Sequence, residues 1–120
     1  MILVDTSVWV DHLRRSEARL VTLLESAEVL VHSFVIGELA CGSLRHRSEL
    51  LELLSALPAA PMATHAEALA FIERHALGGR GIGFLDVHLL AATVLSPGAR
   101  LWTRDKRLST VAEELNLAWR

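Results

Sequence analysis

The stretch that decides the fold is MILVD, residues 1–5, in which four apolar residues run without alternation into one aspartate. A strand with one face in water alternates apolar and polar residues, whereas a strand covered on both faces is apolar throughout. We therefore predict a central strand over residues 2–5, with Asp5 at its carboxyl end. Thr6 and Ser7 follow as candidate caps of a helix over VWVDHLRR, residues 8–15.

The rest of the chain alternates strand and helix patterns. Apolar segments predict strands at 28–32 and 100–103, a turn or very short edge strand at 58–64, and a last strand at 117–119. Apolar residues at helical spacing predict helices at 17–27, 33–42 (capped by Ser33), about 50–57, 65–77, 84–95 and 108–115. This order predicts an α/β fold, a single domain over residues 1–120 whose central, mostly parallel sheet is flanked by helices on both faces.

Composition limits the class of protein. Although 52% of the residues are hydrophobic and the mean hydropathy is +0.37, no apolar run reaches the roughly 18 to 20 residues that cross a bilayer. No signal-peptide pattern opens the chain, so we expect a soluble, cytoplasmic protein without a membrane anchor. Cys41 is the only cysteine, which excludes an internal disulfide and a cysteine-based zinc site, and it is expected to be a small core residue.

The net charge of −2 excludes a general basic field of the kind that dominates non-specific nucleic-acid binding. Any contact with nucleic acid must therefore be local. The basic residues are eleven arginines and Lys106, and eight of these twelve gather at 14–19, 45–47 and 104–107. Arginine suits bidentate contacts with phosphate. A preference for arginine over lysine in the whole chain explains these clusters equally well.

Four of the fourteen acidic residues stand in or directly after the most apolar stretches of the chain. Asp5 ends MILVD, Glu38 is the only charge in SFVIGELACG (33–42), Asp86 is the only acid in FLDVHLLAATVL (84–95), and Asp105 closes LWTRD (101–105). Carboxylates are rarely left buried without a partner, because removing their water costs several kcal/mol. A hard cation such as Mg²⁺ is the partner that such a set of oxygens indicates.

The predicted topology brings these acids together. Asp5 and Asp105 follow the carboxyl ends of strands, while Glu38 and Asp86 lie in the early turns of helices, and ligands of open parallel sheets bind at that edge. Taken singly, Asp5 could cap a helix, Asp86 could favour a helix N-terminus and Asp105 could open a turn. All four together predict a shared metal site, with Glu38 the hardest to explain structurally because no basic residue lies one helical turn away.

The histidines and the glycine-rich loop give weaker evidence of function. His12, His46, His65 and His75 fall on polar faces or helix ends and are expected at the surface, and no HExxH pair indicates zinc. His88 lies two residues from Asp86, points away from it on a helix, and receives no role. The loop GGRGIG (78–83) follows a helix and lacks the P-loop lysine, so we interpret it as a connector that delivers Asp86, with Arg80 a candidate for a backbone contact.

The four motifs, in this order over the whole chain, resemble those of a PIN domain, specifically the short VapC-type toxins of bacterial toxin-antitoxin pairs. The resemblance implies that Asp5, Glu38, Asp86 and Asp105 form the acidic metal site of a ribonuclease that binds Mg²⁺ or Mn²⁺. It places Thr6 and Thr103 beside that site. It further implies an RNA substrate cut internally to leave a 5′-phosphate, a cognate antitoxin that extends a tail into the groove, and a homodimer.

The chemistry agrees with this resemblance. Phosphodiester hydrolysis needs an activated water and neutralised charge on the phosphate, which carboxylates and divalent cations provide. Asp5 and Asp86 are expected to be direct metal ligands because both lie at rigid element ends, while Glu38 and Asp105 complete the shell or orient the attacking water. The alternatives are a non-catalytic RNA-binding or scaffolding module of the same fold and a Mg²⁺-binding phosphorelay receiver domain. Thr6 and Ser7 stand where a receiver has acids, and Ser7 also replaces the second aspartate of a haloacid-dehalogenase-type phosphatase.

Overall fold

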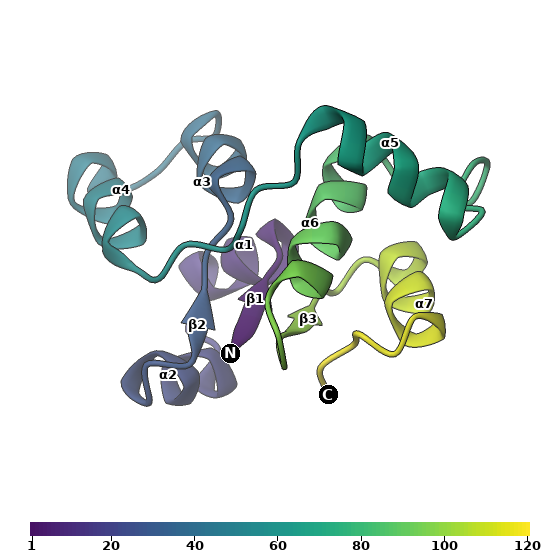
Figure 1. Cartoon of the computed structure of the whole chain (residues 1–120). Coiled ribbons are helices and arrows are strands. Elements are labelled where there is room, and N and C mark those ends of the chain that lie inside the picture. The colour runs from purple at the N-terminus through teal and green to yellow at the C-terminus, as the bar shows by residue number, and fades with distance from the viewer.

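The computed structural model describes all 120 residues (Figure 1). Strands β1 (Ile2–Val4), β2 (Val29–Leu30) and β3 (Arg100–Trp102) form one sheet in the order β2-β1-β3. β1 pairs in parallel with both neighbours, and all three of its residues are buried. The predicted central strand is confirmed, and every strand pair in the sheet is parallel.

Two further segments join the sheet by single bridges. Ala59 pairs in parallel with Val31 outside β2, and Ala118 pairs in parallel with Leu101 outside β3. The predicted last strand at 117–119 is thus reduced to one bridge, and the segment at 58–64 contributes a bridge of the same kind. Each segment supplies too few backbone partners to form a ladder.

Seven helices surround the sheet (Figure 1). In chain order they are α1 (Thr6–Arg14), α2 (Ala18–Glu25), α3 (Ser33–Ala40), α4 (Arg47–Ala56), α5 (His65–Arg74), α6 (Phe84–Leu95) and α7 (Lys106–Glu114). Six of them match the predicted helices closely, while α4 begins before the predicted start near residue 50. Its preceding residue, His46, has a left-handed backbone with φ 51°.

The helix caps differ from the prediction in two places. Asp5 caps α1, in place of Thr6 or Ser7, because its Oδ1 accepts the Thr6 N–H at 2.8 Å. His32 caps α3 in place of Ser33, with Nδ1 accepting the Phe34 N–H at 3.0 Å. In both cases the last residue of the strand segment starts the helix, so no separate turn is needed.

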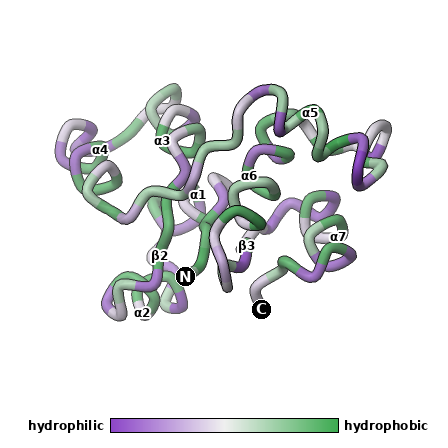
Figure 2. Tube along the Cα trace, in the orientation of Figure 1, coloured by the Kyte–Doolittle hydropathy of each residue, from purple (hydrophilic) through white to green (hydrophobic).

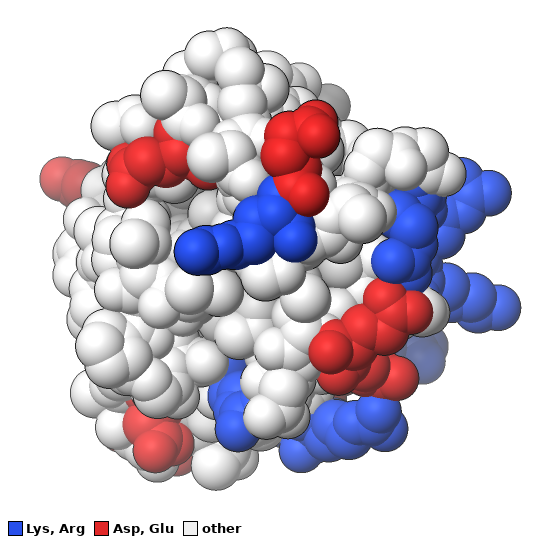
Figure 3. Space-filling view, turned by 45° about the vertical axis from the view of Figure 1, so that its right-hand side comes forward, with Lys and Arg blue, Asp and Glu red and all other residues white.

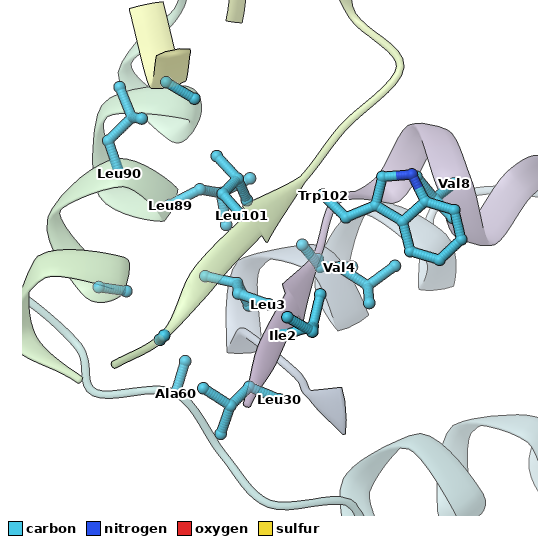
Figure 4. Packing of buried hydrophobic residues seen from close by; sticks show 14 of the residues in the cluster. Ile2, Leu3, Val4, Val8, Leu30, Ala60, Leu89, Leu90, Leu101 and Trp102 are labelled. Atoms are coloured by element: carbon cyan, nitrogen blue, oxygen red, sulfur yellow. The ribbon is translucent and has the colours of Figure 1, made fainter. Parts of the chain in front are cut away.

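The core lies on both faces of the sheet (Figure 4). On one side Leu101 points toward Leu89 of α6, and on the other Val4 and Trp102 point toward Val8 of α1 (Figure 4). Burying a side chain of this size stabilises the fold by about 1.5–3 kcal/mol. The two layers fix the axis of β1 and therefore the position of Asp5 at its end.

Apolar residues concentrate in β1 and α6, whereas α7 and the outer end of α5 are largely polar (Figure 2). Seven residues of α6 are buried, which confirms the predicted buried helix. Cys41 is exposed just after α3, so its prediction as a core residue is wrong; the chain leaves the core at the end of that helix. None of the helices is long and apolar enough to span a membrane.

Candidate active site

Asp5 is a buried carboxylate held by three donors. It is 6% exposed at the end of β1. Its Oδ1 accepts the Thr6 N–H, and its Oδ2 accepts the hydroxyls of Ser7 at 2.8 Å and Thr103 at 2.7 Å. A carboxylate has about four acceptor positions, so one remains, on Oδ1. The three donors fix the orientation of Asp5 and still leave it able to bind a cation.

Ser7 and Thr103 link Asp5 to the segment after β3. Ser7 Oγ accepts the Arg104 N–H at 3.0 Å, and Thr103 Oγ1 accepts the Asp105 N–H at 3.0 Å. Each hydroxyl therefore donates to Asp5 and accepts from the backbone beyond β3. This arrangement joins the two strand ends, β1 and β3, that carry Asp5 and Asp105.

Asp105 is exposed and caps α7, since its Oδ1 accepts the Leu108 N–H at 2.9 Å. Glu38 is exposed on α3, and Thr6 Oγ1 donates to its Oε1 at 3.3 Å. The contact between α1 and α3 thus brings Glu38 to the first turn of the helix that Asp5 caps. The structural alternative for Asp5 is confirmed, since Asp5 caps α1, whereas Asp105 caps α7 and does not simply open a turn.

Asp86 is the acid whose surroundings involve the other three. It lies half-buried in the first turn of α6, where its Oδ2 accepts the Gly83 N–H at 3.0 Å. Burial raises the pKa of Asp86 above its ordinary value of 3.8, and the charges of Asp5, Asp105 and Glu38 raise it further, against the lowering effect of the Gly83 hydrogen bond. Three segments distant in sequence therefore place a carboxylate close enough to act on the charge of Asp86.

No lysine, arginine or histidine forms a salt bridge with any of these four carboxylates. Arg104, the immediate neighbour of Asp105, pairs instead with Asp11 at 2.7 Å and with Glu17. The site therefore keeps an unneutralised negative charge. Its repulsion can be relieved by protons or by a cation.

The donor set fits a hard divalent cation. All candidate ligands are carboxylate oxygens, which Mg²⁺ and Mn²⁺ prefer, and none is a sulfur or an imidazole nitrogen. No three His, Cys, Asp or Glu side chains lie close enough in this structure to form a metal cage. The chemistry of the donors therefore fits such a cation, whereas their spacing in this structure does not form a finished coordination shell.

Two histidines are buried, one at the start of α3 and one in α6, and their burial was not predicted. His32 is fully buried and His88 is 4% exposed; Nε2 of the first and Nδ1 of the second have no hydrogen-bond partner. Burial lowers the pKa of each imidazole, and His88 adds to the effect on His32. Both rings pack against Phe34, with centroids 5.0 and 4.9 Å away, so the pair is part of the aromatic packing between α3 and α6. The only sequence signal was the location of each in an apolar segment.

The other predicted positions have clear outcomes. His12, His46, His65 and His75 are exposed or partly exposed, as predicted. The loop GGRGIG does lead directly into α6 and Asp86, and Arg80 binds Glu114 of α7 at 2.8 Å. The bond from Ser7 to Asp5 was not predicted; the available signal was the position of Ser7 two residues after a strand-ending aspartate.

Comparison with known proteins identifies the family. The model of the PIN domain matches residues 2–114. Two relatives named Ribonuclease VapC32, from Mycobacterium tuberculosis strains CDC 1551 / Oshkosh and ATCC 25618 / H37Rv, are each 51% identical over 118 residues. The alignments cover 98% of this chain and 95% of each relative, so the similarity includes all four acidic segments. The chain therefore belongs to the PIN-domain family, within its VapC group.

Proposed function

We propose that this chain is a metal-dependent endoribonuclease and the toxin of a toxin-antitoxin pair, acting as one domain over residues 1–120. The observation that carries the proposal is the hydrogen-bonded link from Asp5 through Thr103 to the Asp105 N–H, which joins the carboxyl ends of β1 and β3. The pKa of Asp86, raised by burial and further by the charges of Asp5, Asp105 and Glu38, supports it. Four carboxylates at one sheet edge, none paired with a basic residue, suit divalent cations and, through them, a phosphodiester. The ribonuclease name of relatives 51% identical to this chain supports RNA as the substrate.

Each carboxylate has a role that follows from its surroundings. Asp5 and Asp86 would hold Mg²⁺ or Mn²⁺, since both are partly or fully buried and are fixed by hydrogen bonds. The cation, when bound, neutralises charge on the phosphate and lowers the pKa of water. Glu38 and Asp105 are exposed and are suited to accept hydrogen bonds from the attacking water or to bind the cation through water.

Purified protein and single-stranded RNA provide the test. We expect internal cuts that need Mg²⁺ or Mn²⁺, stop in EDTA and leave 5′-phosphates. Sequencing of both ends of the products distinguishes internal cutting from trimming. RNA binding without metal-dependent cleavage would contradict the proposal and would favour the non-catalytic RNA-binding module.

The antitoxin has a suitable groove beside Glu38. A cavity of about 600 Å³ lies between α1, α3 and α4, lined by Thr6, Leu13, Glu38, Leu39, Arg45 and Leu50. Its apolar walls can bind a hydrophobic segment, and an arginine from the same segment could pair with Glu38 and compete with metal. Competition between the antitoxin and Mn²⁺ for the toxin, measured by calorimetry, tests this mechanism; unchanged metal affinity in the complex contradicts it.

The proposed homodimer is supported by large apolar side chains that the chain covers only in part. Leu69 of α5 is 47% exposed, and Val94 and Leu95 of α6 are 53% and 45% exposed. Sedimentation velocity over a range of concentrations tests this point. A monomer at all concentrations would contradict the dimer without affecting the nuclease.

A further inference from the structure

Another pocket lies against α7, near the candidate active site. It has a volume of about 200 Å³ and is lined only by Arg80, Lys106, Arg107 and Thr110, which we call the basic pocket. No hydrophobic residue lines it. Three cationic side chains around one small hollow form a local concentration of positive charge in a chain whose net charge is −2.

Two of these cations have no acidic partner. Arg80 binds both oxygens of Glu114, at 2.8 and 3.0 Å, so its charge is largely compensated. Neither Lys106 nor Arg107 forms a salt bridge. The Thr110 hydroxyl donates to the Lys106 carbonyl at 2.9 Å and therefore contributes shape instead of a free donor. The pocket keeps two uncompensated positive charges that an anion can neutralise.

The loop before α6 makes room for Arg107. Gly81 has φ +82°, a left-handed conformation that glycine adopts without strain. A Cβ at this position would lie 2.7 Å from Arg107 Nη1 and 2.8 Å from its Cδ. The guanidinium therefore packs directly on the loop backbone, which limits its freedom and directs it to the wall of the pocket.

Two of the lining residues lie close in sequence to the candidate site, since Arg80 directly precedes Gly81 and Arg107 follows Asp105. Gly81 is two residues before Gly83, whose N–H binds Asp86, and Arg107 is two residues after Asp105. Two residues of chain span at most about 7 Å. The pocket is therefore close to Asp105 and to Gly83, the hydrogen-bond partner of Asp86. Figure 3 shows basic side chains gathered toward one edge of this side of the molecule, among acidic ones, without a continuous basic surface.

We infer that the basic pocket binds a backbone phosphate of the RNA strand, within one or two nucleotides of the phosphate that is cut. The inference rests on the proposed function for its ligand. A substrate phosphate beside carboxylates experiences repulsion, and Lys106 and Arg107, which form no salt bridge, supply an uncompensated attraction close to Asp105. Arginine matches phosphate oxygens bidentately, and lysine adds a point charge. The pocket has no apolar wall for a base, so it fixes the register of the strand without reading its sequence.

The test measures binding of a short single-stranded RNA in EDTA, so that metal-dependent cleavage does not consume the ligand. Lys106→Gln and Arg107→Gln are each expected to weaken binding by about tenfold at low salt, the usual effect of losing one charge-assisted hydrogen bond. The slope of log K against log salt should decrease by about 0.7 for each phosphate charge that the variant no longer neutralises. The control Arg74→Gln removes an exposed cation from α5 and should bind RNA as the wild type does.

A phosphate scan locates the bound phosphate. Each phosphate of the RNA is replaced in turn by a neutral methylphosphonate, and one position should weaken binding to wild type by about tenfold but have no effect on Arg107→Gln. Equal RNA affinity of Arg107→Gln, Lys106→Gln and Arg74→Gln would overturn the inference. The inference would also be overturned if Lys106→Gln and Arg107→Gln kept their affinity for RNA but lost binding of a poly-glutamate peptide. That result would make the pocket a protein-docking site. Because binding is read without cleavage, absence of nuclease activity alone would count against the proposed function and not against the basic pocket.

Discussion

The first turns of α5 and α6 contain the same hydrogen bond from a backbone N–H to an acidic side chain, but the pKa values of the two acids shift in opposite directions. In α5 the Glu67 Oε1 accepts the Thr64 N–H at 2.8 Å, and in α6 the Asp86 Oδ2 accepts the Gly83 N–H at 3.0 Å. Both acids stand three residues after the residue that precedes the helix. Hydrogen bonds from the Thr64 backbone and side chain lower the pKa of Glu67, whereas burial and three neighbouring carboxylates raise that of Asp86.

The difference teaches that a helix-capping role does not exclude a functional one. Glu67 is exposed and interacts only with Thr64, the residue that caps its own helix, so its charge is stabilised. Asp86 makes the same kind of bond, but the fold adds Asp5, Glu38 and Asp105 to its surroundings. The tertiary surroundings, and not the local hydrogen bond, therefore distinguish Asp86, the candidate site acid, from Glu67.

The largest expected effect is on RNA cleavage. Asp86→Asn keeps the side-chain volume and an oxygen for the Gly83 N–H but removes a charge at the metal site, so cleavage should fall at least about a hundredfold. Asp5→Asn should do the same, and Glu38→Gln and Asp105→Asn should also impair cleavage. Initial rates with a labelled RNA provide the measurement.

The matched controls for cleavage are Glu67→Gln, from the equivalent turn of α5, and Asp11→Asn, six residues beyond Asp5. Both should cleave RNA at the wild-type rate. Wild-type rates in all four site variants, with contaminating nuclease excluded, would show that the carboxylate cluster does not carry the chemistry.

A smaller effect is expected from the hydroxyl that orients Asp5. Thr103→Ala removes the 2.7 Å bond to Asp5 Oδ2 and the acceptor of the Asp105 N–H. Removing such a supporting hydrogen bond typically lowers metal affinity about 10- to 100-fold. Calorimetric Mn²⁺ titration measures this change, with Thr22→Ala as control because the Thr22 hydroxyl binds only a carbonyl of its own helix. Equal affinity in the two variants would mean that Asp5 needs no support from Thr103.

A change in the first turn of α5 should alter stability and leave metal binding unchanged. Thr64 Oγ1 accepts the Glu67 N–H at 3.1 Å, and loss of a threonine cap costs about 1 kcal/mol. Thr64→Ala should therefore lower the free energy of unfolding by about that amount, measured by urea denaturation, and leave Mn²⁺ affinity unchanged. A change of Mn²⁺ affinity in Thr64→Ala would contradict the separation of the two turns.

The smallest effects are opposite pH dependences in metal-free protein. The raised pKa of Asp86 means that the unfolded chain releases its proton first as pH rises, so this carboxyl costs stability above its folded pKa and nothing well below 3.8. Asp86→Asn should thus gain stability relative to wild type between about pH 4 and pH 8. The lowered pKa of Glu67 stabilises the fold at neutral pH and loses this effect in acid, so Glu67→Gln should lose stability relative to wild type over the same range. Parallel urea titrations across this range test the signs, and slopes of the same sign for both variants would contradict the account.

The sequence predicted the fold well where one physical signal dominated. MILVD is apolar without alternation because β1 is covered on both faces, and the apolar periodicity of 84–95 followed from the burial of α6. The edge segments at 59 and 118 were ambiguous, since a single bridge leaves almost no hydrophobic pattern. The start of α4 was missed because its first turn is polar and begins after the left-handed His46.

For the site, the sequence named the four acids but not the hydrogen bonds that orient them. A carboxylate inside an apolar run, such as Glu38 or Asp86, can be recognised from the sequence alone. The bond from Thr103 to Asp5 joins residues 98 positions apart and depends on the pairing of β1 with β3. The exposure of Cys41 was missed because a small apolar residue has no preference strong enough to show that its helix has ended.

The central claim, that the carboxylates form one cation site, is tested most directly by thermal unfolding with and without Mn²⁺. A cation that binds only the folded form adds RT ln(1 + [L]/Kd), about 2.7 kcal/mol at a hundredfold excess over Kd. Wild type, Glu67→Gln and Asp11→Asn should gain the same rise in melting temperature, reversed by EDTA. Asp86→Asn should show a much smaller rise, while its metal-free form melts no lower than wild type. An equal rise in wild type and Asp86→Asn would place the cation elsewhere and contradict the account.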